Sequence, residues 1–430
     1  MHSQPSRPRV DILAVLMLGG FINFLTIFEL TPLLPGIARE FGVSAALGGQ
    51  LATATALAAF AGSLLATPFM DRVGRRAWLW AEAGLLGAGL LVSALAPGFG
   101  WLLAGRVISG LGLAVLMANV YAVTRETFAE PWRTRALALF MSAAVLAFIA
   151  GLPLVTTVNA EAGWRAALAV TGVPLALFLG GIGRIPPGSP GASAGAAGAA
   201  GAAGADGRFG AFRKVGRQRE VMLLYGVIVA INGAYDGWLT YFGAWLDHQF
   251  AISATMLSLL FLVSGVLELG GDSTVPAMIR RGGARPVMAA GALICALALL
   301  LAGSAFASVG GAFAMATMMN VGTAAVLIGV NARLLATPTP VPGAVMSLAA
   351  AANGLGNWIG PLLTGTLLAA SGDYPAAYRL LGLAPLICIA CIGLAGPARS
   401  RVARTERGAR PARPAAARQG RAASSSSGPR

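Results

Sequence analysis

Long apolar segments recur from one end of this chain to the other, and each has room to cross a ~30 Å hydrocarbon core. Only 11% of the 430 residues are charged, against about 25% in ordinary soluble proteins. Backbone groups in lipid must be satisfied within a segment, and the alternation typical of strand barrels is missing, so the segments predict helices. We expect twelve spans, at 11–38, 44–69, 75–97, 99–124, 134–158, 164–184, 220–244, 255–279, 286–307, 310–335, 342–370 and 376–396.

The basic residues alternate between the two sides of these predicted spans. The net charge is +15, but nearly all Arg fall in every second loop, in the central segment and at the termini. The opposite loops hold only Arg39, Arg165 and Arg379. This is the positive-inside pattern, so it predicts a multi-pass protein of the plasma (inner) membrane with both termini cytoplasmic. The expected partner is a lipid bilayer, and no binding of nucleic acid is expected.

Composition divides the chain into four parts. Residues 186–219 begin with a Pro/Gly/Ala/Ser-rich stretch and end in a basic one, which predicts a flexible cytoplasmic linker. The linker separates residues 1–185 from residues 220–396, each with six predicted helices. Residues 397–430 are rich in Arg, Ala and Ser, and we expect a disordered basic tail.

The two six-helix parts repeat each other at an offset of 209 residues. Polar or backbone-determining residues recur at that spacing in pairs: Asn23 and Asn232, Thr31 and Thr240, Arg72 and Arg281, Gly74 and Gly283, Gly151 and Gly360, Gly163 and Gly372. Parallel repeats of this kind are typical of transporters built from two halves around an axis along the membrane normal.

A basic loop between the second and third spans carries the first family signature. It contains Asp71, Arg72, Gly74, Arg75 and Arg76, in a segment that resembles the G-x-x-x-D-R-x-G-R-R motif of the major facilitator superfamily, with Thr67 in place of the first Gly. A carboxylate there could pair with an Arg or a helix N-terminus. We expect this loop to gate the change between two conformations; simple positive-inside anchoring is the alternative.

Further segments extend the resemblance over nearly the whole chain. Arg106-x-x-x-Gly110-x-Gly112 resembles a second motif of the superfamily, and the predicted first, second, sixth and eleventh spans resemble its arabinose-efflux and drug:proton antiporter branch. The resemblance implies an all-α fold of twelve helices in two pseudo-symmetric six-helix bundles, working as a monomer. It implies proton-driven export of a small molecule without a cofactor. Gly151-Leu-Pro153 departs from the Gly-Pro of many exporters, so the direction of transport stays open.

Ionisable groups inside the predicted spans are costly and mark function by default. Four of them are candidates for coupling protons to substrate: Glu29, Arg106, Asp236 and Glu268. The resemblance places the first, fourth, seventh and tenth spans around a cavity, so Glu29, Arg106 and Asp236 are expected to face a shared pore. A purely structural Glu29–Arg106 pair, or an Arg106 that reaches the interface, is the alternative. Glu82, beside Trp80, is expected to reach the membrane interface.

Other side chains are expected to line the cavity. They are Asn23, Asn232, Trp238, Asn353 and Trp358. Interhelical hydrogen bonding and packing explain the same residues equally well.

Other functions find less support in the residues. A phosphate-binding G-x-x-x-x-G-K-[ST] loop is missing, which disfavours a nucleotide-driven pump. Two histidines, His2 and His248, leave no set for a metal site or an enzyme. Proton-coupled efflux by alternating access is therefore the leading hypothesis. Proton-coupled import is the alternative, followed by a transport fold that serves as a sensor.

Overall fold

The computed structural model describes residues 9–66, 69, 73–129, 132–187, 213–337, 339 and 342–395. The described residues belong to one compact unit. The predicted linker from 188 to 212 and the predicted tail lie outside the described residues, so these two predictions stay predictions.

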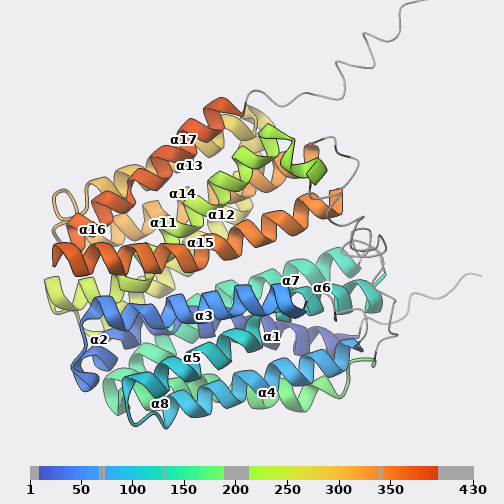
Figure 1. Cartoon of the computed structure of the whole chain (residues 1–430), viewed down its shortest axis with the longest axis horizontal. Helices are drawn as coiled ribbons and strands as arrows, with labels where there is room; N and C mark the ends of the chain where they lie inside the picture. Colours follow the sequence, from blue (N-terminus) through green and yellow to red (C-terminus); the bar gives the residue numbers. More distant parts are fainter. Residues whose placement is uncertain are drawn as a thin grey trace, which may run out of the picture. The chain divides into compact units, whose positions relative to one another are not determined.

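The first half of the chain is helical throughout its described part (Figure 1). Its elements are α1 (Val10–Phe28), α2 (Leu30–Phe41), α3 (Ala45–Ala66), α4 (Arg75–Ala94), α5 (Phe99–Leu113), α6 (Leu116–Thr127), α7 (Trp132–Leu146), the π-helix η2 (Ala147–Gly151) and α8 (Leu152–Ile182).

The second half continues the same pattern after residue 212. Its elements are α11 (Arg219–Phe250), α12 (Ala254–Gly282), α13 (Ala284–Leu300), α14 (Val309–Ala336), α15 (Pro342–Ser371), α16 (Tyr374–Leu381) and α17 (Leu383–Leu394).

Several elements are parts of one membrane pass. The pairs α1–α2, α5–α6 and α16–α17 each form one pass with a break, whereas α8 contains a non-helical Gly163 with φ 82° that separates two passes. Grouped in this way, the described helices make the twelve expected passes. Eight helical segments of the described residues, three of them joined across a break, are long and apolar enough to span a membrane, and two shorter apolar helices add to them. The predicted all-α multi-pass fold is confirmed.

Local sequence explains where several helices begin and where one of them widens. Ser253 Oγ accepts from Met256 N at 3.2 Å at the start of α12, and Ser308 Oγ accepts from Gly311 N at 3.0 Å at the start of α14. Each satisfies an N–H group that has no partner within the helix. The π-turn of η2 falls just before Pro153. Proline has no N–H for the usual helical bond, so a widened turn at this place has a local cause.

Hydrogen bonds join the two halves toward one end of the bundle. We call this end the far side, where α2 and α11 end, and the opposite end the terminus side, where α1 begins. On the far side Thr31 donates to Leu239 O at 3.1 Å, Tyr241 donates to Ala46 O at 3.2 Å, and Ser258 donates to Pro153 O at 3.4 Å. Hydrogen bonds between described residues of the two halves all lie on this side.

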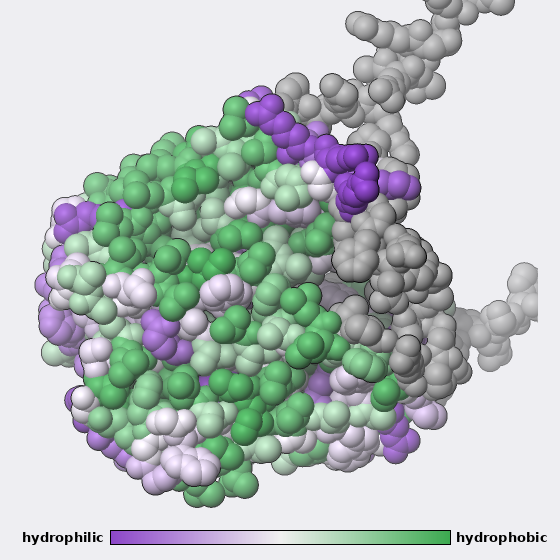
Figure 2. Space-filling view, in the orientation of Figure 1, coloured by the Kyte–Doolittle hydropathy of each residue, from purple (hydrophilic) through white to green (hydrophobic). Residues whose placement is uncertain are grey.

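The outer surface is apolar across the middle of the bundle. Figure 2 shows hydrophobic residues over most of the visible helices, with most hydrophilic residues toward the two ends. Leu65 and Leu95, for example, are each 71% exposed. Such a surface suits hydrocarbon and is unfavourable in water, in agreement with the spans predicted from the sequence.

Candidate functional site

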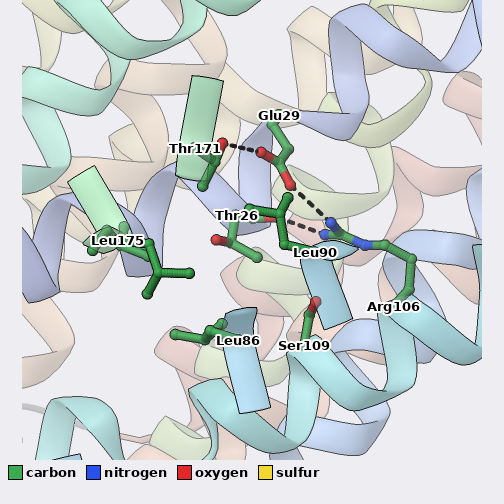
Figure 3. A pocket seen from close by; sticks show the side chains of 9 residues that line it. Thr26, Glu29, Leu86, Leu90, Arg106, Ser109, Thr171 and Leu175 are labelled. Atoms are coloured by element: carbon green, nitrogen blue, oxygen red, sulfur yellow. Dashed lines mark hydrogen bonds and ion pairs between the residues drawn. The ribbon is translucent and has the colours of Figure 1, made fainter. Parts of the chain in front are cut away.

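A buried ion pair joins the break in the first pass to α5. Arg106 Nη1 donates to Glu29 Oε1 at 2.8 Å, and both residues are almost completely buried (Figure 3). Arg106 also donates to Thr26 O at 2.6 Å and to Thr55 Oγ1 at 3.1 Å. Thr171 Oγ1 donates to Glu29 Oε2 at 2.6 Å. The direct Glu29–Arg106 pair, which the sequence left as the alternative to a pore shared with Asp236, is therefore present in the structure.

The local sequence explains why Glu29 lies at this point. It occupies the single residue between α1 and α2, and its N–H still bonds to Leu25 O. Pro32 follows three residues later and has no N–H to donate to Phe28 O, so the helix is interrupted here. Arg106 bonds to the Thr26 carbonyl, one turn before this break.

A small cavity lies beside the ion pair. Its volume is about 10 Å³, close to the minimum for a single water. Figure 3 shows Leu86, Leu90 and Leu175 around it, together with Ser109. These side chains come from α4, α5 and α8, so the pair lies inside the first half, and the cavity is too small for a substrate in this conformation.

Asp236 lies in the other half, in a different environment. With the Asn357 amide oriented to suit both its neighbours, Asn357 Nδ2 donates to Asp236 Oδ2 at 2.9 Å and to Asn353 O at 2.8 Å. Among the described residues, no ion pair joins Asp236 to Arg106. The guanidinium of Arg106 bonds to Thr55, Glu29 and Thr26, which all lie in the first half. The structure thus brings together two of the three charges that we expected around one pore.

Other predicted cavity residues differ in exposure. Asn23 is 5% exposed, and Asn232, at 7%, donates to Ile228 O one turn back in its own helix. Asn353 is exposed and Trp358 is half-buried. Trp238 is 1% exposed and packs against Phe242 and Tyr235, with ring centroids 4.5 and 5.8 Å away, so in this conformation it is a packing residue.

The basic loop is described only in part. Asp71 and Arg72 lie outside the described residues, as does the side chain of Glu268 on α12. Gly74 begins α4 in an extended conformation. Arg75 is 6% exposed and pairs with Glu126 at the end of α6, Nε to Oε1 3.4 Å. Arg76 follows it as a half-buried residue.

The Gly163-Trp164-Arg165 segment fastens the far side of the first half. Trp164 Nε1 donates to Glu40 Oε2 at 2.6 Å, and Arg165 pairs with the same carboxylate. The hydrogen bond from Arg165 is the main cause that lowers the pKa of Glu40, which lies past the predicted span. Glu40 is therefore a carboxylate at neutral pH.

Glu82 corrects one expectation from the sequence. It was expected to reach the interface, but it is 2% exposed, and Asn119 Nδ2 donates to its Oε1 at 2.9 Å. The neighbouring Trp80 is exposed. Only two residues, about half a turn of helix, separate an exposed side chain from a buried one, because the two point to different faces of α4.

Sequence reasoning missed the neutral residues that hydrogen-bond to these charges and to Tyr235. Thr55, Thr171, Asn119 and Asn320 carry no motif, and only packing brings them to their partners. Asn320 Oδ1 accepts from Tyr235 at 2.9 Å and joins α14 to α11. Among the described residues, no three His, Cys, Asp or Glu side chains gather as metal ligands would.

Comparison with known proteins gives the family. The family model of the Major Facilitator Superfamily matches residues 16–277, which is more than half of the chain. With twelve helical passes and charges buried within them, the protein is a multi-pass membrane transporter. It belongs to the Major Facilitator Superfamily.

Curated relatives match over shorter segments. The D-xylose-proton symporter-like 2 of Arabidopsis thaliana is 34% identical over 162 residues, 37% of this chain and 32% of the relative. The purine ribonucleoside efflux pump NepI of Salmonella enteritidis is 32% identical over 155 residues, 35% of this chain and 38% of the relative. The matched segment therefore spans about a third of each relative.

Solved structures resemble the whole described fold. A bacterial homolog of the human lysosomal transporter Spinster, in an inward-facing and unoccupied conformation, has a TM-score of 0.70 at 17% identity, over 91% of this chain and 96% of that one. A D-xylose-proton symporter has a TM-score of 0.70 at 18% identity, over 90% and 97%. At these identities the likeness shows the fold alone.

Proposed function

We propose that this protein exports a small molecule across the plasma membrane in exchange for protons, by alternating access. The observation that carries the proposal is the Glu29–Arg106 pair, a fully buried carboxylate and guanidinium at the break of the first pass. Neutralising one member of a buried charge pair costs free energy, because the other charge is left without compensation. A proton on Glu29 frees Arg106 from its strongest partner, and this release would be the coupling step.

The surroundings of Glu29 support such a switch. Protonated Glu29 keeps the Thr171 contact, since a carboxylic acid retains acceptor capacity and gains a donor. Arg106 keeps Thr26 O and Thr55 Oγ1 as acceptors. Both protonation states therefore have hydrogen-bonding partners, so neither one requires the bundle to unfold.

The second half supplies polar groups for a substrate. Asp236 on α11 and Asn357 on α15 form one connected group, which continues to the backbone carbonyl of Asn353, and Tyr235 and Asn320 form a second. Amides, a phenol and a carboxylate suit hydroxyl-bearing compounds such as sugars or nucleosides, which both donate and accept hydrogen bonds. The named activities of the two relatives, on a sugar and on a nucleoside, agree with this class of substrate.

The contacts between the halves support alternating access. They hold the far side together, and by the positive-inside pattern we assign the terminus side to the cytoplasm. The structure would then represent the state that receives its substrate from the cytoplasm. The basic loop, with Asp71 and Arg72 beside Gly74, Arg75 and Arg76, would control the change to the opposite state; the Arg75–Glu126 pair is the part of it that the structure describes.

The test uses inverted membrane vesicles with an acid interior, to which sugars, nucleosides and cationic dyes are added singly. Release of protons is followed by the recovery of a quenched pH-sensitive dye. We expect a compound that triggers release in the wild type and none in Glu29→Gln. Glu161→Gln, at an exposed residue of α8, is the matched control and should behave as wild type. Release that persists in Glu29→Gln would move the coupling to Asp236 or Glu268.

Import is the second candidate, because one of the matched relatives is named as a symporter. Right-side-out vesicles with an acid exterior distinguish it. Accumulation of the same compound inside them, without proton release from inverted vesicles, would replace export by import.

A further inference from the structure

Glu82 is a buried carboxyl group that the proposed coupling pair does not use. It lies on α4, eight residues into the helix, and Asn119 on α6 is completely buried against it. Asn119 Nδ2 donates to Glu82 Oε1 at 2.9 Å. The other two polar atoms of this contact, Glu82 Oε2 and Asn119 Oδ1, are buried without a hydrogen-bonding partner.

No cation compensates a charge on Glu82 in the described structure. The two buried arginines on its own helix and on the elements packed against it pair elsewhere: Arg75 pairs with Glu126, and Arg106 pairs with Glu29. Glu82 has no hydrogen bond or ion pair with the other ionisable residues described on these elements, which are Arg76, Tyr121, Arg125, Glu161 and Arg165. α3 holds no ionisable residue. An ionised carboxylate here would be buried with one neutral donor, and such a group instead becomes neutral by taking a proton.

A single proton satisfies both atoms that lack partners. The two oxygens without partners, one of a carboxyl group and one of an amide, belong to the two side chains that already share one N–H···O bond. A carboxylic acid has an O–H to donate, and the amide oxygen has lone pairs to accept it. We propose that Glu82 is a proton-binding residue whose neutral carboxyl group forms a two-bond pair with Asn119, with Glu82 O–H donating to Asn119 Oδ1.

This pair has a mechanical consequence because of where Asn119 lies. α6 is separated from α5 by a break at Ala114 and Val115, and Asn119 is on the first turn after it. A groove of about 320 Å³ lies beside the break, lined by Val115, Ala114 and Glu82 among mainly apolar side chains. The pair is therefore a joint between α4 and a half-helix with space next to it. Loss of the proton places a carboxylate oxygen against the amide oxygen and loosens this joint.

The test is infrared spectroscopy of the purified protein reconstituted in lipid at neutral pH. A neutral carboxyl group gives a C=O band apart from that of a carboxylate. In the wild type we expect Glu82 to contribute to the C=O band of neutral carboxyl groups. Glu82→Gln should remove this contribution. Glu126→Gln, the matched control, should keep it, because the Glu126 carboxylate is ion-paired on α6. An identical band in wild type and Glu82→Gln would overturn the proposal.

A second variant keeps the acid and removes its partner, in case Glu82→Gln does not fold. Asn119→Leu should shift the Glu82 band to higher frequency, because the neutral carboxyl group loses both of its hydrogen bonds. A band that stays in place in Asn119→Leu would overturn the pairing with Asn119. Neither measurement uses a transported compound, so each outcome is independent of the proposed export and of the Glu29–Arg106 pair.

Discussion

Arg106 donates to a carboxylate, a hydroxyl and a carbonyl from a position that is 1% exposed, so its replacement leaves the Glu29 carboxylate buried without a cation. We expect Arg106→Met to destabilise the protein by about 3–5 kcal/mol, the usual cost of breaking a buried pair from one side. Glu29→Gln should cost less than Arg106→Met, because its neutral side chain can still accept from Arg106. Thermal unfolding of the purified protein in detergent measures both.

The double variant makes this prediction sharper. With Glu29→Gln and Arg106→Met together, neither member of this pair carries a charge, so part of the loss caused by Arg106→Met should be recovered. If the stability loss of the double variant equals the sum of the losses of the two single variants, the ion pair is contradicted. Arg379→Met is the control, since Arg379 is exposed and its pairing with Asp373 is worth less than about 1 kcal/mol.

A backbone conformation repeats at the 209-residue offset and gives a second prediction. Gly42 and Ala251 both end a helix in the left-handed region, at φ 63° and φ 46°. A side chain in this region costs roughly 1 kcal/mol. We expect Ala251→Gly to stabilise the protein by up to about 1 kcal/mol, and Gly42→Ala to destabilise it by a similar amount, by thermal unfolding. Nothing lies within 4 Å of a Cβ at Gly42, so that cost is one of backbone conformation alone. Equal signs for the two changes would contradict it.

At the scale of helices, α11 and α15 cross where each has a glycine. A Cβ on Gly360 would lie 2.8 Å from Gly233 Cα, whereas a Cβ on Gly233 would have its nearest neighbour, Gly356 O, at 3.7 Å. We therefore expect Gly360→Ala to cost about 1–3 kcal/mol through overpacking. Gly233→Ala should be neutral or slightly stabilising, because alanine favours a helix. Thermal unfolding compares the two, and the opposite order would show that this crossing is not set by backbone contact.

At the scale of the whole molecule, the far-side contact between the halves depends on Gly49. Its missing side chain makes room for the ring of Tyr241, whose hydroxyl donates to α3 at Ala46 O or to α15 at Pro361 O, each 3.2 Å away. Gly49→Val fills this space, so we expect it to separate the halves on the far side and to favour the opposite transport state. The measurement is the distance between spin labels at Arg39 and His248, exposed residues of opposite halves.

The controls for this measurement come from the same chain. Native cysteines are replaced first, since Cys391 is only half-buried. Gly180→Val, where a Cβ meets nothing within 4 Å, should leave the label distance unchanged. An unchanged distance in Gly49→Val as well would show that this contact does not hold the far side closed.

The sequence by itself determined the elements of this protein. Apolar length predicted the twelve passes, because lipid admits helices with all backbone groups bonded internally. Gly163, singled out by the repeat, was correctly placed at a boundary between two passes, since its φ of 82° suits glycine. Glu29 and Arg106 were singled out because charges within apolar segments are few and costly, whereas their direct pairing was only the alternative to a pore shared with Asp236.

Only the tertiary structure decided which surfaces of the helices face one another. Apolar helices have little amphipathic pattern to indicate a direction, so the sequence did not show that Glu82 is buried against Asn119 while Trp80 is exposed. It likewise did not show that Asp236 takes an amide partner from Asn357 while Arg106 bonds within its own half. Thr171 and Thr55 completed the ion pair from distant helices, and neutral residues of this kind give no signal until packing brings them within hydrogen-bonding distance.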